Sequence, residues 1–290
     1  MSSHLISRVT ILGTGLIGGS FALALRKFTS SVHVAGWDRA EVVRQAYSRQ
    51  VIAEAFSGEL PPALEAADLV FIALPIGVTL DLLPEIARHT PQQALVTDAS
   101  STKVRIAKAA SEQFPTEGGR LFLPGHPMAG RELSGLAHAD AELFCNTPYA
   151  LIRDVSSMED PRVAAFVKML KKIGARPLWL NAQQHDETVA LTSHLPQLAA
   201  VALGSLLYDQ LDENGLPIAL AGPGLRDSLR LAGSPYATWR DILLTNREVL
   251  ASTLDLLVRR LEELRERLAS RELQADFDAA NEVYKLLRGL

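Results

Sequence analysis

The sequence predicts an α/β fold, with a parallel sheet covered by helices on both faces over residues 1–181 and an all-helical domain over residues 182–290. Short apolar runs alternate with helical segments in the first part, and this alternation is typical of a parallel sheet. Beyond Asn181 the apolar residues recur at helical spacing, and no further β-like run follows in the sequence. We therefore place the domain boundary at that residue.

A glycine turn organises the first domain. The apolar run RVTIL at residues 8–12 is expected to form the first strand, and the motif GTGLIG at residues 13–18 follows it directly. A helix and a second strand come next, and that strand ends at Asp38. This order of strand, glycine turn, helix, strand and acid is typical of a Rossmann-type dinucleotide-binding site.

Each residue of the turn has an expected role. Gly13 allows a tight turn off the strand, Gly15 lets a pyrophosphate approach the backbone, and Gly18 lets the helix pack closely against the sheet. The free N–H groups at the start of the helix, around Leu16 and Ile17, are expected to face the phosphates. A glycine-rich turn that binds no ligand is the alternative.

The acid at the end of the second strand bears on the choice of cofactor. Asp38 can accept hydrogen bonds from the adenosine ribose and would repel a 2′-phosphate, which favours NAD over NADP. Arg39 follows directly, and its positive charge keeps NADP as an alternative. We therefore expect NAD as the cofactor.

The other elements continue the alternation. The run ADLVFIAL at residues 67–74 is expected to be a buried parallel strand, because it is continuously apolar and contains β-branched and aromatic residues. Further strands are expected at 94–97, 121–123, 148–152 and 175–180, helices at 39–50, 77–89, 103–113 and 160–173, and a connection at 51–62. In the second half, helices are expected at 184–209, 239–270 and 272–288.

The helix expected at residues 184–209 is apolar on most of its circumference. We expect a homodimer in which the helical domains of two chains cover this surface, and burial within a single chain is the alternative. No apolar run is expected to be long enough to span a bilayer.

Composition argues against several kinds of partner and site. The chain has 290 residues and a formal net charge of −4, which gives no general affinity for nucleic acid or acidic membranes. Cys145 is the single cysteine, so we expect no intrachain disulfide, a cytoplasmic protein, and a thiol that packs as a small hydrophobe instead of acting in catalysis. The histidines are scattered without metal-ligand spacing, so no metal site is expected.

Ligands of open parallel sheets bind outside the carboxyl ends of the strands. Leu74, Pro75, Ser101 and His126 all follow expected strands and should lie there. His126 lies between a glycine and a proline, and a neutral imidazole is a good proton acceptor near pH 7. Ser101 is suited to orient a substrate hydroxyl. The alternative for His126 is a ring that only hydrogen-bonds the loop backbone.

The helical domain offers cationic groups. His185 and His194 lie on its first expected helix. Four arginines lie on or beside its helices: Arg226, Arg230, Arg240 and Arg247. Because a guanidinium binds a carboxylate bidentately, the turn at 222–230 is suited to place one arginine in a cleft. Solvated surface charge is the alternative for each arginine.

Taken together, these residues show that the chain resembles the prephenate and arogenate dehydrogenases of tyrosine biosynthesis over nearly its whole length. The resemblance rests on four stretches in order: GTGLIGGS at 13–20, DASSTK at 98–103, GHPMAG at 125–130 and TSHLPQ at 192–197. The arginine-bearing segment at 227–242 is also similar to that family.

This resemblance implies that His126 is the catalytic histidine, that Ser101 contacts the substrate, and that Arg230 binds the ring carboxylate of the substrate. It also implies that a dinucleotide-binding domain is followed by a helical dimerisation domain. The same substrate pocket would be lined by His185, His194 and Gln197.

Gln197 departs from the family pattern. Many members that use prephenate have a second histidine at this position, near the substrate side chain. The choice between arogenate and prephenate therefore stays open, with arogenate, or both substrates, slightly favoured.

The implied reaction is the oxidative decarboxylation of arogenate or prephenate to tyrosine or 4-hydroxyphenylpyruvate, with hydride transfer to NAD(P)+. Its central spatial expectation is that His126 and Arg230 face each other across one crevice with the nicotinamide at its floor. One alternative is a β-hydroxyacid or imine-reducing dehydrogenase, which usually carries a lysine in the helical cleft, whereas residues 182–284 contain none. The other is a non-catalytic NAD-sensing protein.

Overall fold

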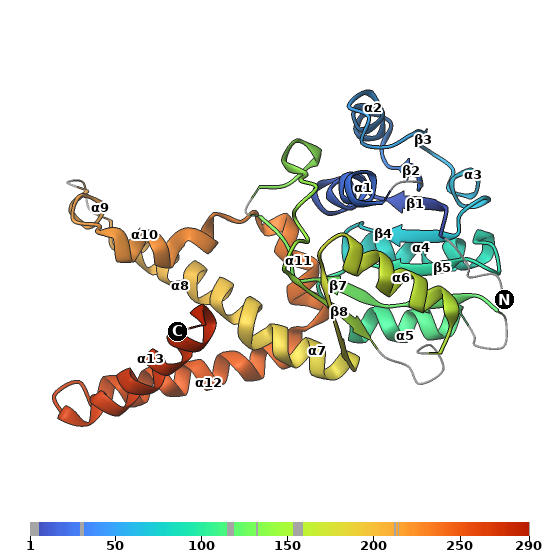
Figure 1. The fold of residues 1–290 in the computed structure, drawn as a ribbon. Helices are drawn as coiled ribbons and strands as arrows, with labels where there is room; N and C mark the ends of the chain where they lie inside the picture. Colours follow the sequence, from blue (N-terminus) through green and yellow to red (C-terminus); the bar gives the residue numbers. More distant parts are fainter. Residues whose placement is uncertain are drawn as a thin grey trace.

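The computed structural model describes residues 6–29, 32–114, 119–131, 133–152, 159–211, 213 and 215–289. It confirms the expected fold class, because a parallel sheet domain is followed by a domain of helices (Figure 1). The last described strand ends at Leu180, and the first helix of the second domain begins at Ala182. Asn181 lies between the two and forms a capping box with Gln184.

Six parallel strands form the main sheet in the order β3-β2-β1-β4-β5-β6. They are β1 (Arg8–Leu12), β2 (His33–Trp37), β3 (Glu54–Phe56), β4 (Leu69–Ile72), β5 (Leu95–Asp98) and β6 (Leu121–Leu123). The short strand β3 lies where the sequence predicts only a connection. The strand order reverses between β1 and β4, and parallel sheets bind ligands at such a switch point.

Alternate residues of one strand face two different cores. In β4, Leu69 and Phe71 contribute to a core that contains Phe21, whereas Val70 and Ile72 contribute to the core on the other face of the sheet. The first face is covered by α1 (Leu16–Phe28), α2 (Ala40–Ser48) and α6 (Pro161–Lys172). The second face is covered by α3 (Pro61–Leu64), α4 (Ile76–His89) and α5 (Val104–Gln113).

A separate three-stranded sheet lies beyond the main sheet; the sequence predicts two of its strands, at 148–152 and 175–180, but neither the third strand nor the separation into a second sheet. Its strands are β7 (Gly125–Pro127), β8 (Pro148–Ile152) and β9 (Arg176–Leu180). β7 is antiparallel to β8, and β8 is parallel to β9. Because β7 is only three residues long and contains a proline, no periodicity reveals it, yet it carries His126.

The helical domain begins with one long run. α7 (Ala182–Val189), a π-helical turn (Ala190–His194) and α8 (Leu195–Asp209) follow one another without a break. The later elements are α9 (Leu216–Ala219), α10 (Pro223–Leu229), the 3-10 turn Arg230–Gly233, α11 (Tyr236–Thr245), α12 (Arg247–Glu266) and α13 (Gln274–Arg288).

The expectation of one helix over residues 239–270 is wrong. Asn246 separates α11 from α12, and its side-chain amide donates to the backbone carbonyl of Asp186 at 2.8 Å. The helix is therefore interrupted where a polar side chain turns back to bind α7. The sequence predicts the loop-to-helix turn at 222–230, where α10 lies, but neither α9 nor the 3-10 turn Arg230–Gly233.

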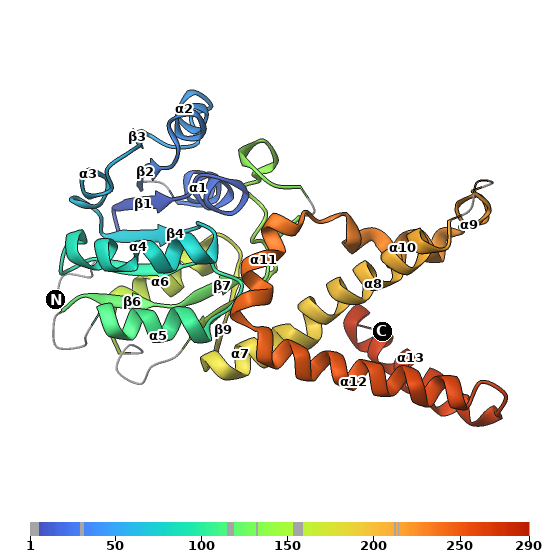
Figure 2. The same cartoon turned by 180° about the vertical axis from the view of Figure 1, so that it is seen from behind.

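Two helical arms extend away from the sheet domain, α8 together with α10 and α12 together with α13 (Figures 1 and 2). In α8, all of whose residues are described, only Gln197 and Ala200 are buried. Large apolar side chains are exposed on α8 and α13: Val201, Leu203, Leu206, Tyr208, Phe277, Val283, Leu286 and Leu287. The described part of the same chain covers α8 only in part, so the alternative of complete burial within one chain does not hold.

The run Ala182–Asp209 is, by length and composition only, apolar enough to cross a membrane, with a mean hydropathy of 1.3. The expectation that no segment reaches this length is therefore wrong on that criterion. An interface helix of a soluble protein passes the same test, so the finding alone is weak support for a membrane span. The run also places the side chains of His185, Asp186 and His194 in buried positions.

Candidate active site

Two glycines of the turn after β1 are required by packing. Gly13 has φ +92°, and a Cβ at this position would lie 2.5 Å from the carbonyl oxygen of Ala73. A Cβ on Gly18 would lie 1.9 Å from the carbonyl oxygen of Gly13. Around Gly15, by contrast, no heavy atom of the described residues lies within 4 Å of the position that a Cβ would take. The turn is therefore closely packed against the protein at Gly13 and Gly18, whereas the space beside Gly15 is open.

The open side of the turn faces a cleft of about 730 Å³ between the two domains. This volume is in the range of sites for small ligands and cofactors. Of the predicted site residues, the cleft is lined by Gly15, Leu16, Ile17, Arg39, Leu74, Pro75 and Ser101. The helical domain contributes a lining from α11 and the segment before it: Ser234, Pro235, Ala237, Thr238, Asp241 and Ile242. His126 and Arg230 are not among the described residues that line the cleft.

Asp38 lies at the end of β2 and is held beside the glycine turn. Its carboxylate accepts the N–H of Thr14 at 2.7 Å, the hydroxyl of Thr14 at 3.2 Å and the N–H of Arg39 at 2.7 Å. Arg39 itself lines the cleft. A carboxylate and a guanidinium therefore both stand near the place where an adenosine ribose is expected.

Lys103, the last residue of the motif DASSTK, is a central residue that the sequence reasoning missed. Its side chain is fully buried, and its ammonium donates to Asp98 at 2.5 Å and to the carbonyl of Gly125 at 2.6 Å. Asp98 also accepts the N–H of Gly125 at 3.0 Å. These bonds join the end of β5, which leads to Ser101, to the strand that carries His126.

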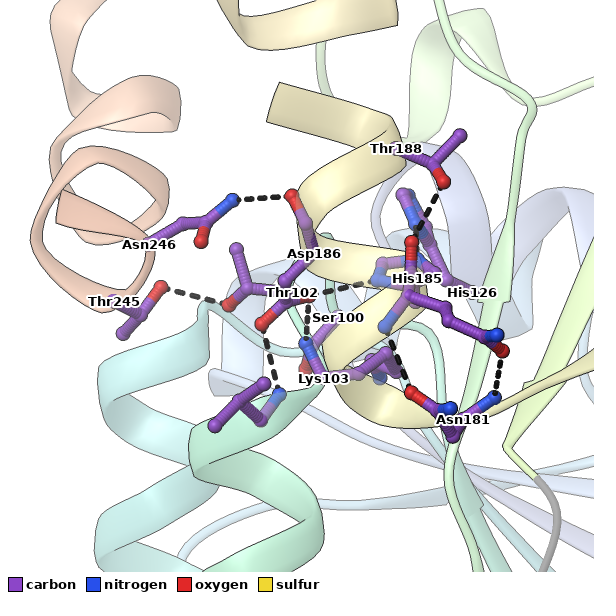
Figure 3. A network of polar contacts seen from close by, with 12 residues as sticks. Ser100, Thr102, Lys103, His126, Asn181, His185, Asp186, Thr188, Thr245 and Asn246 are labelled. Atoms are coloured by element: carbon purple, nitrogen blue, oxygen red, sulfur yellow. Dashed lines mark hydrogen bonds and ion pairs between the residues drawn. The ribbon is translucent and has the colours of Figure 1, made fainter. Parts of the chain in front are cut away.

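Two imidazoles and a carboxylate form a row between the domains (Figure 3). Nδ1 of His126 lies 2.8 Å from Nε2 of His185, and Nδ1 of His185 lies 2.7 Å from Oδ1 of Asp186. Asp186 also accepts the N–H of Lys103 at 2.7 Å and that of Val104 at 2.9 Å. The alternative that the ring of His126 only hydrogen-bonds its own loop is not what the structure shows.

The surroundings disfavour a charged imidazole at His126. Burial lowers its pKa well below the ordinary value of 6.5, and the neighbouring His185, Lys103 and His194 lower it further. A ring that stays neutral at physiological pH has a lone pair available to accept a proton. The structure thus supplies the protonation state that a general base requires.

His194 is a second neutral imidazole at the domain interface. Burial is the main cause that lowers its pKa to about 4, although Asp186 opposes this effect. The side chain of Asn246 lies 3.4 Å from its Nδ1, and its ring meets Trp239 edge-on, with centroids 5.9 Å apart. These contacts fix the ring within the helical domain.

Gln197 is buried and is engaged by the protein. Its side-chain amide donates to the carbonyl of Leu231 at 2.9 Å. The 3-10 turn that begins at Arg230 is thereby fastened to α8. Arg230 is exposed, and of the other arginines Arg240 binds Asp241 through its Nε at 2.9 Å. A shared crevice for Arg230 and His126 stays a prediction.

Two further contacts between the domains flank the cleft, and both were missed from the sequence. Asp241 of α11 accepts the N–H of Gly77 at 3.0 Å, at the start of α4. The hydroxyls of Thr102 and Thr245 lie 2.7 Å apart. The helical domain is therefore bonded to the loops after both β4 and β5, which hold the predicted cofactor-binding and substrate-binding residues.

The described residues contain no cluster suited to bind a metal ion, and no cysteine among them lines the cleft. Within them, no group of three or more His, Cys, Asp or Glu side chains could hold a metal ion. Cys145 is partly exposed, and its thiol donates to the carbonyl of Ile173 at 3.6 Å. This thiol lies next to Gly174, among residues that the cleft does not include.

Comparison with known proteins tests the expected family. Residues 21–178 match the family model of the nucleotide-binding domain of prephenate dehydrogenase, and residues 181–283 match that of its dimerization domain. The first match begins after the glycine turn, so the assignment does not depend on that motif.

Individual relatives agree with the family models. The chain is 34% identical to the prephenate dehydrogenase of Lactococcus lactis over 93% of its own length and 73% of the relative. It is 30% identical to the cyclohexadienyl dehydrogenase of Zymomonas mobilis over 91% of its own length and 89% of the relative. The prephenate dehydrogenase of Aquifex aeolicus, solved with hydroxyphenyl propionate and NAD+, shares the fold with a TM-score of 0.86 at 24% identity, over 99% of each chain. The chain belongs to the prephenate dehydrogenase family.

Proposed function

We propose that this protein oxidises and decarboxylates arogenate, prephenate or both with NAD as the hydride acceptor, and that His126 is the base. Family membership gives the reaction class, a prephenate or arogenate dehydrogenase that uses NAD(P)+. It decides against the β-hydroxyacid or imine-reducing alternative and against a non-catalytic sensor. The observation that carries the finer proposal is the half-buried imidazole of His126, whose low pKa keeps it neutral, held between the two domains.

The glycine turn and its cleft fit a dinucleotide. Gly15 leaves room for a pyrophosphate, and helix α1 begins beside it at Leu16. The N-terminus of a helix favours a phosphate because its first N–H groups have no partner within the helix. Asp38, beside the turn, would accept the ribose hydroxyls, and Ile17, Leu74 and Pro75 supply apolar lining to the same cleft. The bound nicotinamide would supply the site that accepts the hydride.

Arg39 is the residue that limits the preference for NAD. The carboxylate of Asp38 would repel a 2′-phosphate, whereas the guanidinium of Arg39, which lines the same cleft, would attract one. We favour NAD because the carboxylate is fixed in place by three hydrogen bonds, two of them from backbone N–H groups.

The chemistry needs a base and accurate positioning. The substrate is a cyclohexadienol with a hydroxyl at C4 and a carboxylate at C1. His126 would accept the hydroxyl proton while the hydride leaves C4, and the bond from C1 to the carboxylate then breaks, because loss of carbon dioxide makes the ring aromatic. Ser101, which lines the cleft, would orient the hydroxyl.

Arg230 is proposed to bind the ring carboxylate, with His185, His194 and Gln197 around the same pocket. Support comes from the bond between Gln197 and Leu231, which anchors the arginine-bearing turn to the helix that also carries His194. The same bond uses the Gln197 amide group, so this residue positions Arg230 in addition to any contact with the substrate.

We also propose a homodimer formed through the helical domains, in a cytoplasmic protein whose partner is a small-molecule substrate. The exposed apolar side chains of α8 and α13 support it, because a stable monomer rarely leaves so large an apolar surface in water. We propose no nucleic-acid or membrane partner, in keeping with the net charge of −4.

The test is a matrix of four assays. Purified protein is given prephenate or arogenate with NAD or NADP, and formation of the reduced nicotinamide is followed by absorbance. We expect turnover with NAD and at least one of the two substrates. A protein that binds NAD but turns over neither substrate would contradict the proposed function.

A further inference from the structure

We propose that Asp186 and His185 are positioning residues that set the tautomer of His126, so that its Nε2 is the unprotonated nitrogen offered to the substrate. We also propose that they take over the positive charge when that nitrogen accepts a proton. The inference rests on the proposed function for the identity of the base, but its geometry stands independently of any substrate.

The first step is the state of Asp186, whose side chain is 1% exposed. Oδ1 accepts the N–H of Lys103, and Oδ2 accepts the N–H of Val104. Because a backbone N–H points at each oxygen, a carboxyl proton would face a donor at either position. The side chain therefore acts only as an acceptor.

The second step is that an acceptor at Asp186 fixes which nitrogen of each imidazole in the row carries hydrogen. A neutral imidazole carries hydrogen on only one nitrogen. Nδ1 of His185 faces an acceptor, Oδ1 of Asp186 at 2.7 Å, so it must be the nitrogen that donates. Nε2 of His185 is then an acceptor, and Nδ1 of His126, 2.8 Å away, must donate to it. Nε2 of His126 is left without hydrogen, which is the form that a base requires.

The third step concerns charge. The positive charges of His185, Lys103 and His194 would each oppose a positive charge on the ring of His126, and of these His185 contacts the ring. Asp98 forms an ion pair with Lys103 and is not a member of the row. The one carboxylate in the row itself is that of Asp186, two groups away from His126. A positive charge is therefore better placed on His185 than on His126.

The proton balance follows from this arrangement. The substrate hydroxyl proton bonds to Nε2 of His126 while the Nδ1 proton of the same ring moves to Nε2 of His185. His126 is neutral again, and His185 becomes an imidazolium that donates to Asp186. The two transfers reverse when the site next exchanges a proton with water, so no proton is gained or lost over a cycle.

The row is fastened at both ends by the same residue. Lys103 donates through its ammonium to the carbonyl of Gly125, directly before His126, and through its backbone N–H to Asp186. Asn246 holds the backbone carbonyl of Asp186 from the other side (Figure 3). Such locking of a base by its neighbours is what a fixed tautomer requires.

The first test needs no substrate. Long-range ¹H–¹⁵N NMR of labelled protein near pH 8, with each ring assigned by comparison with a single-histidine variant, reports which nitrogen carries hydrogen. We expect hydrogen on Nδ1 of both His126 and His185. Hydrogen on Nε2 of either ring would overturn the proposal, whatever the enzyme turns over.

The second test is kinetic. It compares variants that keep a hydrogen-bond acceptor for His126, and so its tautomer, with variants that also lose that acceptor. His185→Gln keeps an oxygen that can accept from His126, whereas His185→Phe has no acceptor. We expect kcat to fall about 10²-fold or more in His185→Phe and about tenfold in His185→Gln, with the KM for NAD unchanged in both. In Asp186→Asn the acidic limb of the kcat profile should move to lower pH, because a negative charge that favours imidazolium is removed.

Glu187→Gln is the matched control for Asp186→Asn, because Glu187 is the exposed neighbour on the same helix. It should leave kcat and the pH profile unchanged. Provided that the wild type is active, two results together would overturn the proposal. They are a wild-type kcat in His185→Phe and an acidic limb that does not move in Asp186→Asn. An inactive wild type would instead contradict the proposed function, and the NMR result would still decide the tautomers.

Discussion

For Lys103→Met, the structure allows both a loss of stability and a change in the pH dependence of catalysis to be predicted. The ammonium is fully buried and bonded to Asp98 and to the carbonyl of Gly125. Its removal leaves the buried carboxylate of Asp98 without a counter-charge, and breaking a buried ion pair in this way costs about 3–5 kcal/mol. For a protein of this size that is a fall in Tm of roughly 6–20 °C.

The same substitution has an electrostatic effect that packing alone would not produce. The positive charge of Lys103 is one cause that lowers the pKa of His126, so its removal should raise that pKa. The base is then protonated at higher pH, and the acidic limb of the kcat profile should move to higher pH. The shift is opposite in sign to the one expected for Asp186→Asn.

Calorimetry and pH–rate profiles of the same preparations measure both effects. Lys108→Met, at an exposed position on the helix that Lys103 precedes, is the control and should change neither. Adding Asp98→Asn to Lys103→Met should recover part of the lost Tm, because the orphaned charge is removed with its partner. A Tm within about 2 °C of wild type for Lys103→Met would refute the reasoning, since that corresponds to at most about 1 kcal/mol.

Three other predictions concern the helical domain. Arg230→Ala should mainly raise the KM of the substrate with little change in kcat, because it removes ground-state binding; an unchanged KM would count against this role. Leu206→Glu, on the exposed face of α8, should convert the dimer to monomers in analytical ultracentrifugation, whereas Tyr47→Glu on exposed α2 should not; a dimeric Leu206→Glu protein would place the interface elsewhere. The pKa of His194, about 4 when folded and 6.5 when unfolded, makes the unfolded state bind more protons between these values, so stability is lost as pH falls through this window. The loss amounts to about 3 kcal/mol at pH 4, and urea titrations of His194→Gln should show a correspondingly flatter pH dependence; an identical slope would contradict the assignment.

The dinucleotide half of the site could be predicted because its signals are local. Gly13 adopts a φ of +92°, and a Cβ on Gly18 would meet the carbonyl oxygen of Gly13, so both of these requirements arise within the turn itself. Leu74 and Ser101 directly follow buried strands, and parallel topology alone brings strand ends to one edge. Leu74 and Ser101 could therefore be placed in the cleft without knowledge of any side-chain contact.

The network behind the candidate base could not be predicted in the same way. Lys103 in a sequence looks like a solvated lysine, and its burial depends on the contact between the end of β5 and β7. The partnership of Asp186 with α5 depends on how α7 packs across 82 or 83 residues of sequence separation. The signals available were Lys103 at the end of the stretch DASSTK and Asp186 directly after His185, and neither position by itself says which group the charge contacts.

The helical domain shows a third case. Its helices were expected from apolar spacing, but the break at Asn246 carries no proline or glycine and follows from a tertiary hydrogen bond to Asp186. A second chain was expected to cover α8 because apolar residues occupy most of the circumference of this helix, and several of them are exposed in the single chain. Which of these residues form the interface depends on a partner surface that one sequence does not reveal.

The most direct test of the central claim is the single-turnover rate of His126→Ala with saturating substrate and NAD. We predict a rate that is lower than wild type by roughly 10²–10⁴-fold, with the affinity for NAD retained, because the base is lost while the cofactor cleft is intact. A wild-type rate in this variant would show that the imidazole of His126 does not accept the substrate proton.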